Sequence, residues 1–282
     1  MITTTLHEGS GMANQIWNYV VTRTIATDRN LDFGIFGKEN WKGRGFINLD
    51  FGKTPNPLNP ITNFYEEKRV MRGNVLITPA DIDMINVPDN THIEGIMQSV
   101  KYIQHRKKEI CEWIRPSNTY DNPYFNENYC VIHFRGNDYI GAGKTLLPKS
   151  YYINAMEHIK NINKNIKFVV VTDDARLASY YFLDTAEIVG SSIINIPDPY
   201  KSDYHSGGDI SIDYNIIHNT KYLILSNSTF GWWAGWTNKK VKKVIAPLYW
   251  FAHNYTENFW AGSEMRVEED NWMYIDREGN IG

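Results

Sequence analysis

Cysteine is almost absent from this sequence, with only Cys111 and Cys130 among its 282 residues. Two thiols are too few for a disulfide scaffold and their spacing fits no zinc motif, so a reducing compartment is the simplest expectation. The first residues lack the basic and apolar regions of a signal peptide. No stretch reaches the roughly 20 apolar residues of a membrane span. We therefore expect a cytoplasmic protein without an integral membrane segment.

Strong charge of either sign is also missing. The net charge is −3 and neither half of the chain is markedly basic, which argues against nucleic acid as the main partner. One short basic run, at residues 105–108, fits a solvated helix face and leaves peripheral contact with anionic lipid as the alternative.

Several ligand-binding motifs are absent as well. The sequence has no P-loop and no GxGxxG fingerprint, and its histidines lack the spacing of metal ligands. The pair Asp81 and Asp83 lies in an apolar segment flanked by prolines and follows no strand that we predict. We therefore predict that the protein uses neither a metal nor a cofactor.

The second half of the chain alternates predicted strands with predicted helices. Strands are predicted at 129–134, 166–171, 186–189, 193–196, 222–225 and 244–247, and helices begin near residues 150, 175, 209 and 230. Nearly continuous apolar runs such as 166–171 are typical of parallel strands that are covered on both faces. The alternation predicts a doubly wound α/β sheet.

The first half is less regular. A β-branched strand at Ile2–Leu6 leads through a Gly-rich loop into a helix from Met12, a geometry that presents backbone N–H groups to an anion. Residues 37–62 are predicted to form a long loop that contacts substrate, and the apolar spacing over 93–114 predicts one helix. An Asn- and Pro-rich stretch before Tyr129 resembles a linker, so the predicted domains are 1–125 and 126–282.

Polar clusters follow four of the predicted strands, at Gly9–Gln15, Arg135–Asp138, Thr172–Asp174 and Ser226–Thr229. Ligands of open parallel sheets bind beyond the carboxyl ends of the strands, so the last three clusters are expected to converge on one crevice. An arginine at such an edge suits bidentate phosphate binding. Hydroxyl groups and N–H groups at a helix start suit phosphate too.

Each cluster also has a purely structural interpretation. Arg135 can pair with Asp138 across a turn, and Ser226 or Ser228 can cap the helix that follows. Asp173 or Asp174 can cap the helix that starts at Ala175.

The segment Ser226–Trp236, which reads SNSTFGWWAGW, resembles the SNSTFSWWAAW segment of bacterial α-1,2-fucosyltransferases. Shorter segments resemble other motifs of this family in the same order. These are GMANQ at 11–15, GIMQSVKY at 95–102, HFRGNDY at 133–139, LP with YY at 147–152, TDD at 172–174, AP with WF at 246–251, and Trp272.

This resemblance implies a GT-B-like α/β fold of two Rossmann-like domains whose parallel sheets face a central cleft. It also implies metal-free, inverting transfer from GDP-fucose to a glycan acceptor. Arg135 would hold the β-phosphate of the leaving group, and His133 and Asp174 would contact the guanine. The other implied contacts are Ser228, Thr229 and Phe230 around the diphosphate, and Gly11 and Asn14 near donor and acceptor.

Two motif positions differ from the family. The second arginine of HxRR is Gly136 and the second glycine of GLGNQ is Ala13, although Lys144 lies in the turn after Gly136. An inverting transferase also needs a general base near the acceptor hydroxyl. Glu8 and Asp138 are the candidates, and Asp138 is favoured as the acid of the family motif.

The function predicted from the sequence is transfer of L-fucose from GDP-fucose to a galactose-type hydroxyl in α-1,2 linkage. Because Gly136 removes a charged contact, two alternatives stay open. One is a transferase for another GDP-sugar, and the other is a non-catalytic protein that binds nucleotide-sugars or glycans.

Overall fold

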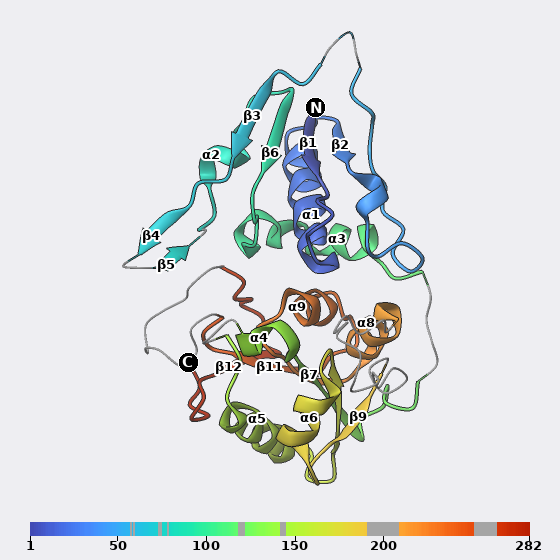
Figure 1. Cartoon of the computed structure of the whole chain (residues 1–282), viewed down its shortest axis with the longest axis vertical. Coiled ribbons are helices and arrows are strands. Elements are labelled where there is room, and N and C mark those ends of the chain that lie inside the picture. Colours follow the sequence, from blue (N-terminus) through green and yellow to red (C-terminus); the bar gives the residue numbers. More distant parts are fainter. Residues whose placement is uncertain are drawn as a thin grey trace. The chain divides into compact units, whose positions relative to one another are not determined.

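A computed structural model describes residues 1–56, 58, 60–72, 75–77, 79–117, 122–141, 145–190, 209–250 and 264–282. The chain folds into two compact units, shown in Figure 1. Unit 1 comprises Met1–Asn118 and Ala261–Val267, and unit 2 comprises Thr119–Trp260 and Glu268–Gly282. The sequence predicts a boundary after residue 125, whereas the units part after Asn118 and a short C-terminal segment returns to unit 1.

Unit 1 is built on a four-stranded parallel sheet with the strand order β2-β1-β6-β3. Its strands are β1 (Ile2–Thr5), β2 (Phe33–Phe36), β3 (Asn63–Glu66) and β6 (Thr91–Glu94), and a separate antiparallel hairpin joins β4 (Val70–Arg72) to β5 (Val75–Ile77). The helices are α1 (Met12–Asp28), α2 (Ile82–Ile85) and α3 (Lys107–Trp113), with 3-10 turns at Lys38–Asn40, Val100–Tyr102 and Gln104–Arg106.

Helix α1 is the central helix of unit 1 and packs along β1. Almost all of its side chains from Met12 to Ala26 are buried, so it is covered on nearly every side and has no broad solvent face. The predicted order of strand, Gly-rich loop and helix is confirmed at β1 and α1.

The prediction of a single helix over 93–114 is wrong for its first half. Ile93 lies in β6, which pairs with β1 and β3, and Met97 has a left-handed φ of 56° that no helix can contain. Gly95 lies so close to Glu67 that an added Cβ would be 2.4 Å from the Cβ of Glu67. Pairing with β1 and packing on Glu67 therefore override the helical spacing, and only Lys107–Trp113 forms an α-helix.

Unit 2 contains a six-stranded, fully parallel sheet with the order β12-β11-β10-β7-β8-β9. Its strands are β7 (Tyr129–Phe134), β8 (Lys167–Thr172), β9 (Glu187–Val189), β10 (Tyr222–Ile224), β11 (Lys243–Pro247) and β12 (Trp272–Ile275). The helices are α4 (Asn137–Gly141), α5 (Lys149–Ile162), α6 (Ala175–Phe182), α8 (Ile210–Asn219) and α9 (Thr229–Trp236).

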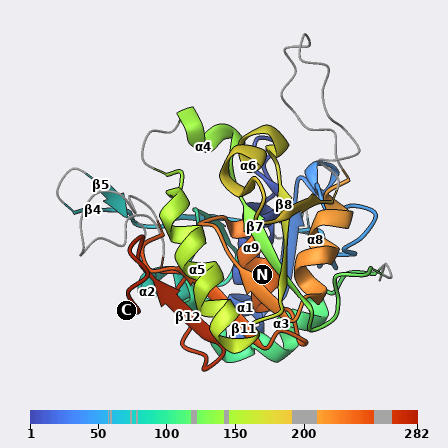
Figure 2. The same ribbon diagram turned by 90° about the horizontal axis from the view of Figure 1, so that it is seen from below.

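Helices cover both faces of this sheet, and Figure 2 shows α5 and α8 on opposite sides of it. Alternate residues of β7 such as Cys130 and Ile132 point into the core beneath α5 and α6. On the other face Gly235 of α9 packs against Leu223 of β10. Two parallel α/β sheets are what the family resemblance implied, and the fold class is confirmed at that level. The predicted strand at 193–196 lies outside the described residues.

The tryptophans of the SNSTFGWWAGW segment belong to the core of unit 2. Trp232, Trp233 and Trp236 are each at most 2% exposed, and their ring centroids lie 5.0–5.5 Å apart. These rings therefore anchor α9 and do not face a ligand.

None of the helices that the structure describes has the length and apolar character needed to cross a lipid bilayer.

Candidate functional site

The strand order of unit 2 reverses between β7 and β10. After β7 the chain adds β8 and β9 on one side, whereas β10, β11 and β12 extend the other side. Ligands of open parallel sheets bind at such a switch point, beyond the carboxyl ends of the strands. The predicted clusters after β7 and β10 meet there, because the Ser226 N–H donates to the His133 carbonyl at 3.0 Å.

Arg135 follows β7 and lies among carboxylates. Its Nη1 is 2.8 Å from Asp173 Oδ2, and its Nη2 is 2.9 Å from Asp138 Oδ1. The guanidinium also lies over the ring of Tyr139, whose hydroxyl donates to the Asn227 carbonyl at 2.9 Å. The structural alternative that paired Arg135 with Asp138 is thus confirmed. The side chain remains 33% exposed, so the guanidinium can still reach a ligand.

Asp173 is the residue that the sequence prediction missed. It is mostly buried, which raises the pKa of its carboxyl, while Arg135 opposes this rise. Its Oδ1 accepts the Gly136 N–H at 2.9 Å, so it links the ends of β7 and β8. The neighbouring Asp174 caps α6 by accepting the Leu177 N–H at 2.9 Å, which confirms the capping interpretation. Recognition of guanine by Asp174 stays a prediction.

A signal for Asp173 was available in the sequence. The helix is predicted to start at Ala175, and Asp174 directly precedes it, so Asp174 was the better capping candidate of the two. Asp173, which is not used as the cap, is then available to bind the residues after the adjacent strand β7.

Gly136, which replaces the second arginine of the motif, packs closely against α6. A Cβ at this position would lie 2.8 Å from the Cβ of Asp174 and 3.2 Å from a methyl group of Leu177. An arginine here would therefore require α6 to shift. Lys144, the suggested substitute for that arginine, lies outside the described residues.

His133 lies beneath the start of α9. Its ring is 5% exposed, and its Nδ1 is 3.0 Å from the Ser226 hydroxyl. Burial, assisted by the charge of Arg135, lowers the pKa of His133 to about 3, so the ring is neutral at neutral pH. The glycine at position 231 lets α9 pack against the His133 ring, since a Cβ at Gly231 would be 2.4 Å from His133 Nδ1. A contact of His133 with guanine stays a prediction.

Ser228, Thr229 and Phe230 form the N-terminus of α9, and Tyr139 links Arg135 to Asn227, the residue before Ser228. Ser228 is the N-cap residue, but its side chain makes no capping hydrogen bond. Phe230 packs between His133 and Tyr214, with ring centroids 5.9 and 5.5 Å away. The start of a helix favours an anion through its N–H groups and its dipole. The placement suits the predicted contact with a diphosphate, which stays a prediction.

The predicted residues of unit 1 surround the N-terminus of α1. Gly11 is the N-cap residue, with φ −65° and ψ 154°, and a Cβ added to it would find no atom within 4 Å. Asn14 accepts a hydrogen bond from the Gln98 amide at 3.0 Å. Glu8 is exposed in the turn that precedes the helix.

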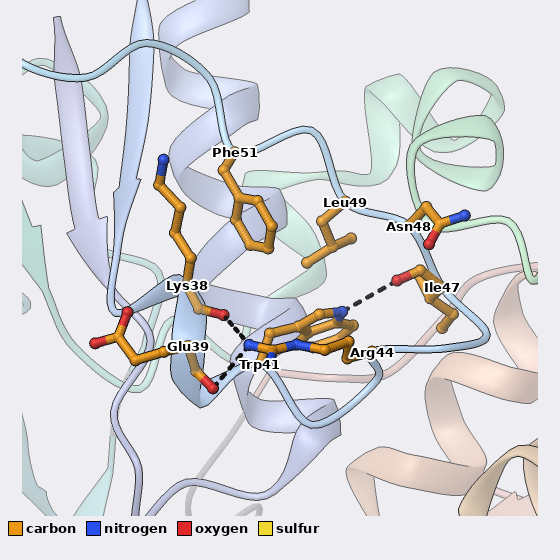
Figure 3. A pocket seen from close by; sticks show the side chains of 8 residues that line it. All are labelled: Lys38, Glu39, Trp41, Arg44, Ile47, Asn48, Leu49 and Phe51. Carbon is orange, nitrogen blue, oxygen red and sulfur yellow. Dashed lines mark hydrogen bonds between the residues drawn. The ribbon is translucent and has the colours of Figure 1, made fainter.

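A pocket of about 440 Å³ opens in the long loop that follows β2 (Figure 3). Trp41, Leu49 and Phe51 form its apolar wall, and Trp41 donates from its indole nitrogen to the Ile47 carbonyl at 3.0 Å. At the rim of the pocket, the Arg44 guanidinium donates hydrogen bonds to the carbonyls of Lys38 and Glu39. The loop predicted to contact substrate therefore holds a pocket with an aromatic wall.

In the described ranges, no three His, Cys, Asp or Glu side chains come close enough together to hold a metal ion. Independence from metals and cofactors stays a prediction.

Comparison with known proteins finds two curated relatives in Escherichia coli. An α-1,2-colitosyltransferase is 26% identical over 177 residues, which cover 58% of this chain and 58% of the relative. The O-antigen biosynthesis glycosyltransferase WbnK is 26% identical over 199 residues, which cover 68% of this chain and 51% of the relative. The chain is a sequence relative of bacterial glycosyltransferases. This confirms the relationship that the motifs predicted, although the chain spans only about half the length of these relatives.

No protein-family model matches the chain. Among solved structures, the α-1,6-fucosyltransferase NodZ soaked with GDP-fucose aligns with a TM-score of 0.45 and 14% identity, over 86% of this chain and 93% of NodZ. NodZ from Bradyrhizobium aligns with a TM-score of 0.44 and 13% identity, over 86% of this chain and 94% of that one. Likeness at this level is too loose to assign a ligand or a reaction.

Proposed function

We propose that this protein is an inverting glycosyltransferase that transfers L-fucose from GDP-fucose to a galactose-type hydroxyl in α-1,2 linkage. The relationship to bacterial glycosyltransferases supports transfer of a sugar, and the family motifs support GDP-fucose as donor. A related sugar is the second candidate, because one relative is named as a colitosyltransferase and colitose is related to fucose.

The observation that carries the proposal is the position of Arg135 at the switch point of unit 2, where Tyr139 links it to Asn227, the residue before the N-cap of α9. In glycosyl transfer the bond from the anomeric carbon to the β-phosphate breaks, and negative charge grows on the diphosphate. Fixed donors aimed at this charge stabilise the transition state. We assign this role to the Arg135 guanidinium and to the first turn of α9.

The acceptor is assigned to unit 1 in this proposal. The aromatic wall of the pocket in the loop after β2 offers the kind of apolar surface against which a sugar ring can pack. Gly11 leaves the backbone at the start of α1 open to a close-lying ligand.

Calorimetry with GDP, UDP and CDP tests the donor half of the proposal. We expect GDP to bind in the presence of a metal chelator, and Arg135→Ala to weaken binding by about 10-fold or more, since a charge-assisted contact contributes about 1.5–3 kcal/mol. Lys242→Ala is the matched control, because it removes a cation that pairs with Glu127 at the opposite edge of the same sheet. Equal binding of UDP and GDP would contradict the assignment of the donor.

Release of GDP tests the transfer itself. Wild-type protein is incubated with GDP-fucose and galactose-terminated acceptors, and the product linkage is determined. Binding of GDP-sugars without release of GDP across a panel of donors and acceptors would favour a non-catalytic binding protein.

A further inference from the structure

A second switch point lies in unit 1. The order β2-β1-β6-β3 places β2 on one side of β1 and β6 on the other, so the strand order reverses between β1 and β6. His7 follows β1, and Glu94 is the last residue of β6. The two side chains therefore stand at the carboxyl edge of this sheet, where open parallel sheets bind their ligands.

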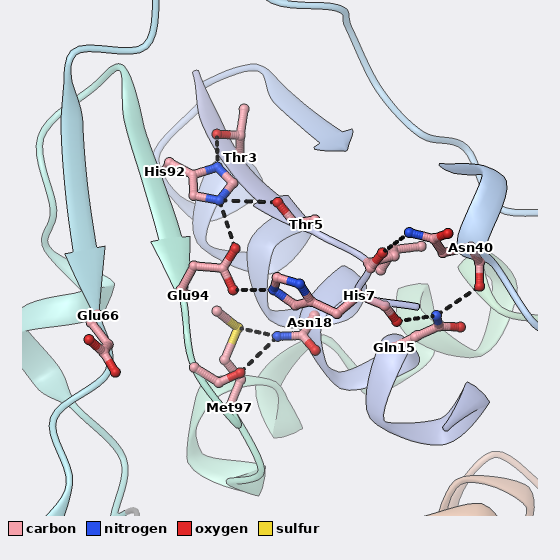
Figure 4. A network of polar contacts seen from close by, with 12 residues as sticks. Thr3, Thr5, His7, Gln15, Asn18, Asn40, Glu66, His92, Glu94 and Met97 are labelled. Carbon is pink, nitrogen blue, oxygen red and sulfur yellow. Dashed lines mark hydrogen bonds and ion pairs between the residues drawn. The ribbon is translucent and has the colours of Figure 1, made fainter. Parts of the chain in front are cut away.

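His7 and Glu94 are directly hydrogen-bonded, with His7 Nε2 2.8 Å from Glu94 Oε2. On the other carboxylate oxygen, Glu94 accepts from His92 Nε2 at 2.9 Å, and His92 Nδ1 lies 2.9 Å from the Thr3 hydroxyl. Figure 4 shows both imidazoles converging on Glu94. His7 is 57% exposed, whereas Glu94 and His92 are 21% and 16% exposed, so only His7 is open to a ligand.

The charge and proton positions of this pair follow from its contacts. Partial burial favours the protonated form of Glu94, but hydrogen bonds from His92 and His7 outweigh it, and the pKa of Glu94 lies below its ordinary value. An ionised carboxylate only accepts hydrogen bonds, so His7 carries its proton on Nε2. In the neutral imidazole, Nδ1 is then the nitrogen that holds the lone pair of a base.

Two side-chain amides of α1 hold the backbone on both sides of the pair. The Gln15 amide donates to the His7 carbonyl at 3.1 Å and to the Asn40 carbonyl at 2.9 Å. The Asn18 amide donates to the carbonyl of Gly95, the residue after Glu94, at 3.0 Å. Both amides are buried, so α1 holds the backbone of His7 and of Gly95, which follows Glu94.

We propose that His7 is the general base of the transfer reaction and that Glu94 is the residue that positions it. The inference rests on the proposed function. It moves the base away from Asp138, whose carboxylate is paired with Arg135, and away from Glu8, which is exposed in the adjacent turn.

The reaction balances with this assignment. The acceptor oxygen forms a bond to the anomeric carbon, and the bond from that carbon to the β-phosphate oxygen breaks, with its electron pair leaving on GDP. The acceptor hydroxyl proton passes to His7 Nδ1. Glu94 stabilises the resulting imidazolium, as a carboxylate does for a catalytic histidine, and the proton is then released to water.

The test compares His7→Ala, Glu94→Gln and the matched control Glu66→Gln. Glu66 is the register partner of Glu94 on the neighbouring strand β3, and Figure 4 shows it apart from both histidines. We expect His7→Ala to lower kcat by about 10²–10⁴-fold, the usual contribution of a general base. Added imidazole should restore part of the activity, and GDP affinity by calorimetry should match wild type.

Glu94→Gln should lower kcat by about 10-fold or more with little change in acceptor KM, because it removes the negative charge that orients and stabilises His7. Glu66→Gln should behave as wild type. Full activity of His7→Ala would overturn the proposal, and so would a loss that imidazole does not rescue or an equal loss in Glu66→Gln. A wild-type protein that releases no GDP with any acceptor would instead remove the proposed function itself.

Discussion

At the scale of single residues, the two carboxylates around Arg135 bear on the proposed binding of the donor. In the proposed function, GDP replaces at least one of them as partner of the guanidinium. Asp138 is the more exposed of the two, at 62% against 18% for Asp173, so it is the easier one to displace.

We predict that Asp138→Asn tightens GDP binding by up to about five-fold, because it removes an exposed ion pair worth about 0.2–1 kcal/mol that competes with the diphosphate. Calorimetry measures the effect. A large fall in turnover with unchanged GDP affinity would contradict this and make Asp138 the base.

Gly11 allows a test of ligand approach that does not disturb the fold. Its φ and ψ suit alanine, and a Cβ would meet no atom within 4 Å. We predict that Gly11→Ala leaves the melting temperature equal to or above that of wild type, since the unfolded chain loses freedom. The KM for donor or acceptor should rise because the new methyl group would stand where the proposed function places a substrate. An unchanged KM for both would show that no substrate approaches Gly11.

The residues of the site were predictable to different degrees. Arg135 and Ser228 could be found from strand ends alone, because parallel strands present their carboxyl ends at one edge. The burial of His133 and the close contact of Gly136 with α6 depend on packing between segments far apart in the sequence. The pairing of His7 with Glu94 joins β1 to β6, and no spacing along the chain reveals it.

At the scale of elements, the sheet of unit 2 was predictable and that of unit 1 was not. Strands β7, β8 and β11 are buried along almost their whole length, so their apolar runs are clear. Strand β3 is mostly exposed and carries no such run, and β6 has a pattern that also fits a helix. The short helix α4 was missed because it carries no distinctive period of its own, whereas β12 was missed although its four residues form an apolar, mostly buried run.

The contact between β7 and α9 makes the fold sensitive to acid. The pKa of His133 lies near 3 and that of His218, on α8, near 4, both lowered from 6.5 mainly by burial. Below a pH of about 6.5, both histidines become protonated in the unfolded chain but stay neutral in the folded protein. The free energy of unfolding therefore falls as the pH decreases.

Between about pH 7 and pH 5, wild type should lose about 2 kcal/mol of its free energy of unfolding through His133, since one such group contributes about 1.4 kcal/mol per pH unit. The variant His133→Gln lacks this loss. We therefore predict that the difference in free energy of unfolding between wild type and variant becomes smaller by that amount. Urea unfolding at several pH values measures this. A difference that stays constant with pH would show that His133 is protonated in the folded state.

At the scale of the whole molecule, the chain leaves unit 1 and later returns to it. Glu264 fastens the returning segment by accepting hydrogen bonds from the Ala80 N–H at 3.0 Å and the Ser99 hydroxyl at 3.1 Å. Its carboxylate also pairs with Lys101 at 2.8 Å, and its backbone carbonyl accepts the Val100 N–H at 3.0 Å.

We predict that Glu264→Ala destabilises unit 1 by about 1–3 kcal/mol, because it leaves these donors without their charged partner. Glu278→Ala, in the exposed turn after β12, should change stability by less than about 0.5 kcal/mol. Thermal unfolding measures both, and equal effects would show that the segment is not fastened through Glu264.

This return of the chain bears on how unit 1 can be exchanged between related chains. A single genetic crossover near residue 118 would join a foreign unit 1 to the resident segment 261–267, whose Glu264 would then meet unmatched partners. A chimera that takes unit 1 and segment 261–267 from the same parent keeps the contacts of Glu264 intact. Successful exchange of unit 1 therefore requires two crossovers, and libraries built with one junction should be rich in misfolded products.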